Sequence, residues 1–141
     1  MNTYRPKHFA LVELVGPEIF KERGDRCWEL LQVPALLTLD AMRKRFGPII
    51  VNDWFHGGNY SESGLRRFDS KTGAEYTMHK TGGADDCKFK LVSPIEAFNY
   101  ILAHPSEFPY LTTMEDAKQT VTWLHFDVRN HSREGIWVVN P

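Results

Sequence analysis

The sequence predicts a single α+β domain, with N-terminal helices packed on a small antiparallel sheet. The first half of the chain has helical spacing of its apolar residues, whereas the second half has short segments in which apolar and polar residues alternate. A chain of 141 residues, 42% of them hydrophobic, can bury one core and is too short for two ordinary domains. Helices that precede the strands favour an antiparallel sheet over a parallel α/β fold.

Three helices are expected. The first covers residues 17–31 and begins with a proline, which is favoured at the first helical position; Gly24 is a candidate break in it. The second covers residues 34–46 and ends at a glycine followed by a proline. The third is the clearest, because Ser93-Pro94-Ile95-Glu96 is a capping box and Pro105 stops the helix.

The middle of the chain predicts two strands separated by a long loop. Ile49-Ile50-Val51 is typical of a short buried strand, and residues 52–77 are rich in Gly, Ser, Asn and Asp. Loops of this length in compact domains are usually functional. Residues 86–92 then alternate, which directs Asp86 away from the apolar face of its strand.

The last third of the chain predicts a hairpin. Residues 121–129 and 136–139 have the pattern of strands, and a polar turn joins them. Residues 110–114 are expected to add an edge strand. In the first of these segments, alternation places His125 and Asp127 together on one face.

The composition argues against a nucleic-acid or anionic-membrane partner. The chain has 17 basic and 18 acidic residues, a net charge of −1, and the two signs are interspersed. No stretch approaches the ~20 apolar residues of a membrane span. The segment from Met1 to His8 lacks the apolar core of a signal peptide, so we expect a soluble protein without an export signal. Cys27 and Cys87 are expected to be buried free thiols.

One set of residues could form a metal site. If Asp86 and His125 lie on neighbouring strands and face the same way, a glycine turn at residues 81–84 can bring His79 beside them. Two imidazoles and one carboxylate are the ligands of a catalytic zinc site, which keeps a further position for water. Six histidines make such a triple common by chance, so spacing alone favours purely structural roles: a turn cap, a solvated strand residue and a half-buried histidine.

Three sequence blocks resemble the signature of the M15 peptidase family. They are Ser63-Gly64-Leu65-Arg66, the segment from Tyr76 to Asp86, and Trp123-Leu124-His125-Phe126-Asp127-Val128-Arg129, and they follow one another in the family order over roughly residues 60–130. The family pattern Ser-x-His-x-x-Gly-x-Ala-x-Asp is met at His79, Gly82, Ala84 and Asp86, with Thr77 in place of Ser. The family comprises D-Ala-D-Ala carboxypeptidases, dipeptidases and phage endolysin peptidases, and shares a zinc-binding fold with the Hedgehog signalling domain.

The resemblance implies a zinc peptidase that hydrolyses a bond in peptidoglycan stem peptides. It implies that His79, Asp86 and His125 bind Zn²⁺ and that Arg66 holds a substrate carbonyl or carboxylate. Asp127 would orient a ligand or anchor Arg129, and a plain salt bridge is an equal alternative. The resemblance also implies a phage-encoded protein, found in the host cytoplasm before lysis or in the virion.

One departure from the family concerns the general base. Many catalytic members have Glu or Asp three residues before the last zinc histidine, where this chain has Thr122. Alternation also predicts that Thr122 faces away from His125. The nearest upstream acids, Glu115 and Asp116, lie in a predicted turn that could fold over the site, and Glu115 is the preferred candidate. The second interpretation is a non-catalytic zinc domain, a binding or virion structural module that kept the metal and lost the base.

Overall fold

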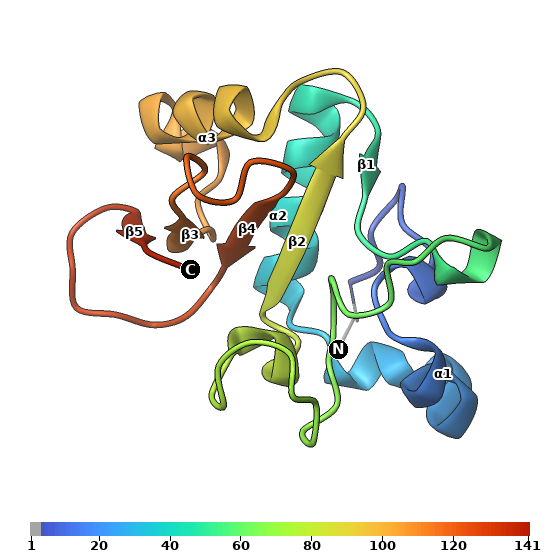
Figure 1. Cartoon of the computed structure of the whole chain (residues 1–141). Helices are drawn as coiled ribbons and strands as arrows, with labels where there is room; N and C mark the ends of the chain where they lie inside the picture. Colours follow the sequence, from blue (N-terminus) through green and yellow to red (C-terminus); the bar gives the residue numbers. More distant parts are fainter. Residues whose placement is uncertain (1–3) are drawn as a thin grey trace.

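The computed structural model describes residues 4–141 and has an α+β fold, as predicted (Figure 1). Within this range the α-helices are α1 (Pro17–Arg23), α2 (Val33–Phe46) and α3 (Pro94–Ala103). The first three residues of the segment predicted to lack a signal peptide lie outside the described part of the chain. In residues 4–141, no helix has the length and apolarity needed to cross a membrane.

The helix boundaries follow the predicted signals. Gly24, with a φ of 54°, ends α1 where a break was expected, and Gly24–Leu30 continues as a 3-10 helix. The capping box of α3 is confirmed. The Ser93 hydroxyl accepts a hydrogen bond from the Glu96 N–H at 3.2 Å, and the Glu96 carboxylate accepts one from the Ser93 N–H at 2.8 Å.

The five strands form one mixed sheet. The strands are β1 (Ile49–Ile50), β2 (Ala84–Phe89), β3 (Thr113–Glu115), β4 (Leu124–Asp127) and β5 (Trp137–Val139), in the spatial order β1-β2-β4-β3-β5. Every neighbouring pair is antiparallel except β3 and β5, which are parallel. The prediction of a wholly antiparallel sheet is therefore wrong at this one edge.

The predicted hairpin of residues 121–129 and 136–139 is also wrong. Both sides of β4 are occupied, one by β2 and the other by β3, so β5 cannot pair with β4 and instead pairs with the far side of β3. Thr112 is hydrogen-bonded to both ends of the segment that connects β4 to β5. Its hydroxyl donates to the Arg129 carbonyl at 2.6 Å, and its carbonyl accepts from the Trp137 N–H at 2.9 Å. The expected edge strand at residues 110–114 thus becomes the inner strand β3.

The two faces of the sheet have different surroundings. Helices α2 and α3 cover one face, where Cys87, Leu124 and Phe126 are fully buried in the main core. The free thiols of Cys27 and Cys87 are both buried, as predicted. The opposite face carries Asp86 and Lys88 of β2 and His125 and Asp127 of β4, and the long loop before β2 folds beside it (Figure 1). Asp85, the register partner of Phe126, is a buried acid on the core side. Alternation along the strands therefore separates the core from the candidate site.

Candidate metal centre

His79, Asp86 and His125 converge on one point of the polar face. They come from the 3-10 helix Met78–Thr81, from β2 and from β4. His79 Nε2 lies 3.2 Å from His125 Nδ1 and 3.3 Å from Asp86 Oδ1, and the last two atoms are 2.9 Å apart. Both imidazoles are buried and Asp86 is half-buried. The three side chains that the sequence singled out are thus brought together in a group that could hold a metal ion.

Local sequence signals position each of the three residues. Asp86 and His125 are register partners on adjacent antiparallel strands, so their side chains share a face. The hydroxyl of Thr77 caps the 3-10 helix by accepting the His79 N–H at 3.4 Å, a contact that Ser and Thr can both make. Gly82, with a φ of 72°, then turns the chain back into β2.

When the two rings are neutral, the contacts on their outer sides fix the nitrogen that carries the proton. His79 Nδ1 lies 2.9 Å from the Gly64 carbonyl oxygen, and His125 Nε2 lies 3.0 Å from Asp127 Oδ2. Carbonyl and carboxylate oxygens only accept, so both of these nitrogens donate. In neutral rings His79 Nε2 and His125 Nδ1 are then bare, and both face the Asp86 oxygen. Three electron-pair donors that meet at one point fit a bound cation.

The spacing of these atoms also fits a small tetrahedral metal ion. Zinc binds imidazole nitrogen and carboxylate oxygen at about 2.0–2.2 Å, and the edges of a tetrahedron with such bonds are about 3.3–3.6 Å long. The observed distances of 2.9, 3.2 and 3.3 Å lie at or slightly below the short end of this range. The site could therefore accept the ion with shifts of a few tenths of an ångström.

The acidic and basic side chains of the site also hold one another in their charged forms. Burial lowers the pKa of His125, but its hydrogen bonds with Asp127 and Asp86 outweigh burial and raise the pKa to about 9. Burial raises the pKa of Asp86, yet the contacts with His125 and His79 hold it well below its usual value. Burial likewise opposes the lowering of the Asp127 pKa to about 2 by His125 and Arg129. These contacts favour the imidazolium form of His125 between the two carboxylates.

Asp127 both orients a histidine and anchors an arginine. Its side chain is fully buried; Oδ2 contacts His125, while Oδ1 accepts from Arg129 Nε at 2.8 Å. The two roles that the sequence left as alternatives for this residue are thus both visible in its contacts.

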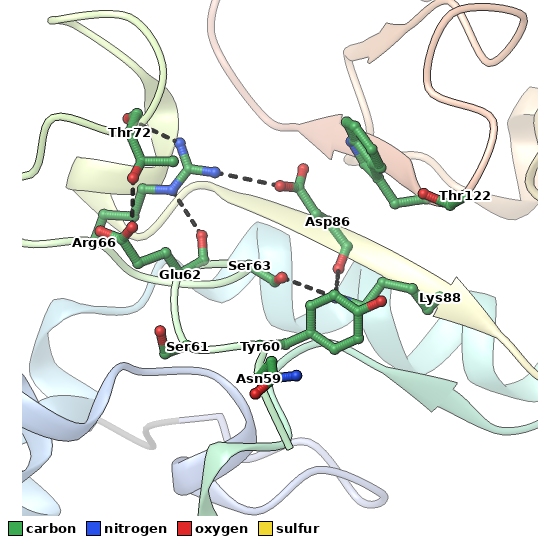
Figure 2. A pocket seen from close by; sticks show the side chains of 11 residues that line it. Asn59, Tyr60, Ser61, Glu62, Ser63, Arg66, Thr72, Asp86, Lys88 and Thr122 are labelled. Atoms are coloured by element: carbon green, nitrogen blue, oxygen red, sulfur yellow. Dashed lines mark hydrogen bonds and ion pairs between the residues drawn. The ribbon is translucent and has the colours of Figure 1, made fainter.

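Arg66 lies directly beside the triad. Its Nη2 donates to Asp86 Oδ2 at 3.3 Å, the oxygen that does not face the histidines, while Nε donates to the Glu62 carbonyl at 2.7 Å (Figure 2). Its Nη1 donates to the Thr72 carbonyl at 3.2 Å. The backbone is fixed too, because the Arg66 N–H donates to the His79 carbonyl at 3.0 Å. Arg66 is therefore a buried, pre-oriented cation next to a candidate ligand.

Of the two candidate general bases, Glu115 lies at the triad and Asp116 does not. Glu115 lies in β3 rather than in a turn, and extending the β3–β4 register places it opposite His125 on the same face. It lines a hollow together with all three triad residues. Asp116 does not line that hollow, and its Oδ1 accepts the Lys118 N–H at 3.0 Å. Only Glu115 is brought to the site.

The alternation from which the orientation of Thr122 was predicted does not reach that residue. The strand begins at Leu124, and residues 120–123 form a turn closed by the Trp123 N–H and the Thr120 carbonyl. The strand period therefore does not extend to Thr122. Thr122 lines a second hollow, which Asp86 also lines (Figure 2).

Lys88 belongs to the surroundings of the site although the sequence assigned it no role. It follows Asp86 by two residues and so shares its face, which is the signal that could have revealed it. Its ammonium group donates to Ser63 Oγ at 2.8 Å and to the Asp86 carbonyl at 3.2 Å (Figure 2). It also donates to the Val51 carbonyl. Three acceptors for three protons give Lys88 a structural task, which is to hold the long loop against β2.

Sequence and fold similarity add no further evidence on function. The chain matches no protein-family model, no curated protein and no solved structure. Function is therefore inferred from the geometry of the site, together with the resemblance of the three sequence blocks.

Proposed function

We propose that this chain is a zinc-dependent peptidase that hydrolyses a peptide bond in the stem peptides of bacterial peptidoglycan. The observation that carries the proposal is the convergence of one nitrogen of His79, one nitrogen of His125 and one carboxylate oxygen of Asp86 at the wall of a hollow of about 420 Å³. Two histidines and one carboxylate, with a position left open, are typical of catalytic zinc sites, whereas structural sites prefer four ligands and cysteines. The resemblance to M15 peptidases supports the substrate class.

Zinc held by the triad would supply a Lewis acid that polarises a peptide carbonyl and activates water. Neutral imidazole nitrogens also suit copper, iron and nickel, so the metal is itself part of the proposal. The proton on His125 must leave before its Nδ1 can bind the ion, while Asp127 continues to hold the other ring nitrogen.

Arg66 would stabilise negative charge on the carbonyl oxygen of the bond that is cleaved. Its contacts with Glu62, Thr72 and Asp86 occupy three of its five N–H donors, which leaves two for a substrate oxygen. Because the same contacts fix the guanidinium before substrate arrives, little reorganisation would be needed during the reaction.

Glu115 would accept and return the proton. It is half-buried and lies on the strand next to His125, on the opposite side from Asp86. In this proposal the carboxylate expected at position 122 is replaced by one from the neighbouring strand. General acid–base catalysis by a positioned carboxylate typically contributes 10²- to 10⁴-fold to the rate.

A non-catalytic zinc module is the second candidate function. The observation that favours it is Thr122, which lines a hollow beside Asp86 and has no group that could act as a base at neutral pH. A binding or virion structural role would keep the metal without turnover.

Metal analysis and digestion of purified peptidoglycan test the proposal together. We expect close to one zinc per chain and the release of new amino termini, both lost in His125→Ala. Glu115→Gln should keep its zinc and lose activity by 10²- to 10⁴-fold, whereas Asp116→Asn should resemble the parent. Zinc without release of amino termini would favour the non-catalytic module. A metal-free protein that is indifferent to His125→Ala would overturn both.

A further inference from the structure

The side chain of Glu62 joins two parts of the long loop that precedes β2. Its Oε1 accepts the Ser70 hydroxyl at 2.5 Å, and its Oε2 accepts the Thr72 hydroxyl. Ser70 Oγ in turn accepts the Thr72 N–H at 3.2 Å. One carboxylate therefore holds residues that lie eight and ten positions further along the chain.

The same two parts of the loop bind the guanidinium of Arg66 through their backbone. Nε donates to the Glu62 carbonyl at 2.7 Å, and Nη1 donates to the Thr72 carbonyl at 3.2 Å (Figure 2). Arg66 is buried, so water competes little for these donors. The Glu62 carboxylate is linked to Arg66 through Thr72, whose hydroxyl it accepts and whose carbonyl receives Nη1.

We infer that Glu62 is a positioning residue, whose carboxylate keeps the Thr72 carbonyl against Arg66 and so fixes the guanidinium for the reaction. The inference rests on the proposed peptidase function and adds a residue to it. Without the carboxylate, Nη2 would still be held by Asp86, so the guanidinium would become looser rather than leave the site. Donors that stabilise a developing negative charge must be held in place beforehand. A looser guanidinium should therefore affect kcat more than KM.

The charge of Glu62 suits this task. Hydrogen bonds from Ser70 and Thr72 lower its pKa against the effect of burial, and the positive charge of Arg66 lowers it further. A carboxylate can only accept, and hydrogen bonds to a charged acceptor are stronger than those between neutral groups. Glutamine would keep one acceptor oxygen and lose the charge, so it should hold the loop only in part.

Gly73 shows how closely the loop packs on the guanidinium. It has a φ of 75°, and a Cβ at this position would lie 2.7 Å from Arg66 Nη1. Because that nitrogen is held by the Thr72 carbonyl, a methyl group here must displace either the guanidinium or the loop. Gly135 is a matched comparison, since its φ is 67° and its Cβ would have no neighbour within 4 Å.

Steady-state kinetics of the zinc-loaded protein on a synthetic stem peptide test the inference. We expect Glu62→Ala to lower kcat by about tenfold or more and to change KM by less than about threefold. Thr72→Val, which removes one hydroxyl and keeps the carbonyl, and Glu62→Gln should have smaller effects in the same direction. Glu75→Ala, at an exposed acid of the same loop, should resemble the parent.

A double-mutant cycle separates positioning of Arg66 from a general role in the fold. Adding Glu62→Ala to Arg66→Ala should change kcat by less than about twofold, because the carboxylate acts through the arginine that is already absent. A further loss as large as that caused by Glu62→Ala alone would overturn the inference.

Exchange of the Arg66 Nε proton with water provides a readout that does not depend on turnover. In ¹⁵N spectra of the metal-free protein, with Arg66→Lys used to assign the signal, this buried proton should exchange slowly. Glu62→Ala and Gly73→Ala should each speed its exchange by about tenfold or more, whereas Glu75→Ala and Gly135→Ala should not.

The outcomes distinguish the inference from the proposed function. Unchanged exchange and kcat in Glu62→Ala would overturn the inference and leave the peptidase proposal standing. A parent protein that protects the Arg66 proton yet cleaves neither stem peptide nor peptidoglycan would overturn the peptidase function, and the positioning role with it.

Discussion

His125 Nε2 lies 3.0 Å from Oδ2 of Asp127, a carboxylate with no exposed surface. The contact fixes the ring orientation and leaves Nδ1 as the atom that faces Asp86 at 2.9 Å. A buried anion on the far nitrogen also increases the basicity of the ring as a ligand. The orientation of His125 in the candidate metal centre therefore depends on this pair.

Asp127→Asn should weaken zinc binding without abolishing it. The amide keeps the shape of the side chain but removes the charge that holds His125, and changes of this kind typically cost 10- to 100-fold in metal affinity. Competition with a chromophoric chelator measures the effect. Arg129→Gln is the matched control, because it removes the other partner of Asp127 and keeps the contact with His125. Equal losses in the two variants would contradict a special role for the His125 contact.

His79→Ala should remove the metal and its stabilising effect. The parent should gain about 2.7 kcal/mol in free energy of unfolding when free zinc is 100 times its Kd, since a ligand that binds only the folded state stabilises it. The variant should show no such gain in urea titrations with and without zinc. His104→Ala is the control, as His104 is exposed at the end of α3. A zinc-dependent gain in His79→Ala would show that the ion binds elsewhere.

The metal-free protein should lose stability as the pH rises from about 6.5 to about 9. The pKa of His125 is raised to about 9 in the folded state, above the value of about 6.5 in an unfolded chain. The folded state therefore keeps a proton that the unfolded state has released, and the stabilisation that is complete below pH 6.5 fades as the pH approaches 9. Urea titrations with a chelator present measure the slope. In His125→Gln the slope should shrink, and an unchanged slope would assign it to another group.

The parts of the fold that sequence predicts well are those governed by local signals. Alternation identified the face of Asp86 and His125, and the capping box fixed the start of α3. The parallel pairing of β5 was missed because it depends on β3 occupying the free side of β4. Such long-range pairing of strands cannot be predicted from the alternation of apolar and polar residues within each strand. The prediction for Thr122 had no basis in the fold, because alternation was extended past the true start of the strand at Leu124. Glu115 was preferred on position alone, whereas its place beside His125 follows from strand pairing.

Gly82→Ala should destabilise the fold far more than Gly57→Ala. Both glycines end a 3-10 helix in the left-handed region, with φ of 72° and 88°, so both substitutions incur about 1 kcal/mol of backbone strain. They differ in surroundings. A Cβ at Gly82 would lie 2.0 Å from the Leu30 carbonyl oxygen, whereas a Cβ at Gly57 would have no neighbour within 4 Å.

The steric clash should lower the free energy of unfolding of Gly82→Ala by about a further 1–3 kcal/mol. Relief of the clash would displace the turn that connects His79 to β2. We therefore expect a lower free energy of unfolding in urea together with weaker zinc binding, while Gly57→Ala keeps the zinc affinity of the parent. Similar unfolding midpoints for the two variants would mean that the contact between Gly82 and Leu30 does not constrain the turn.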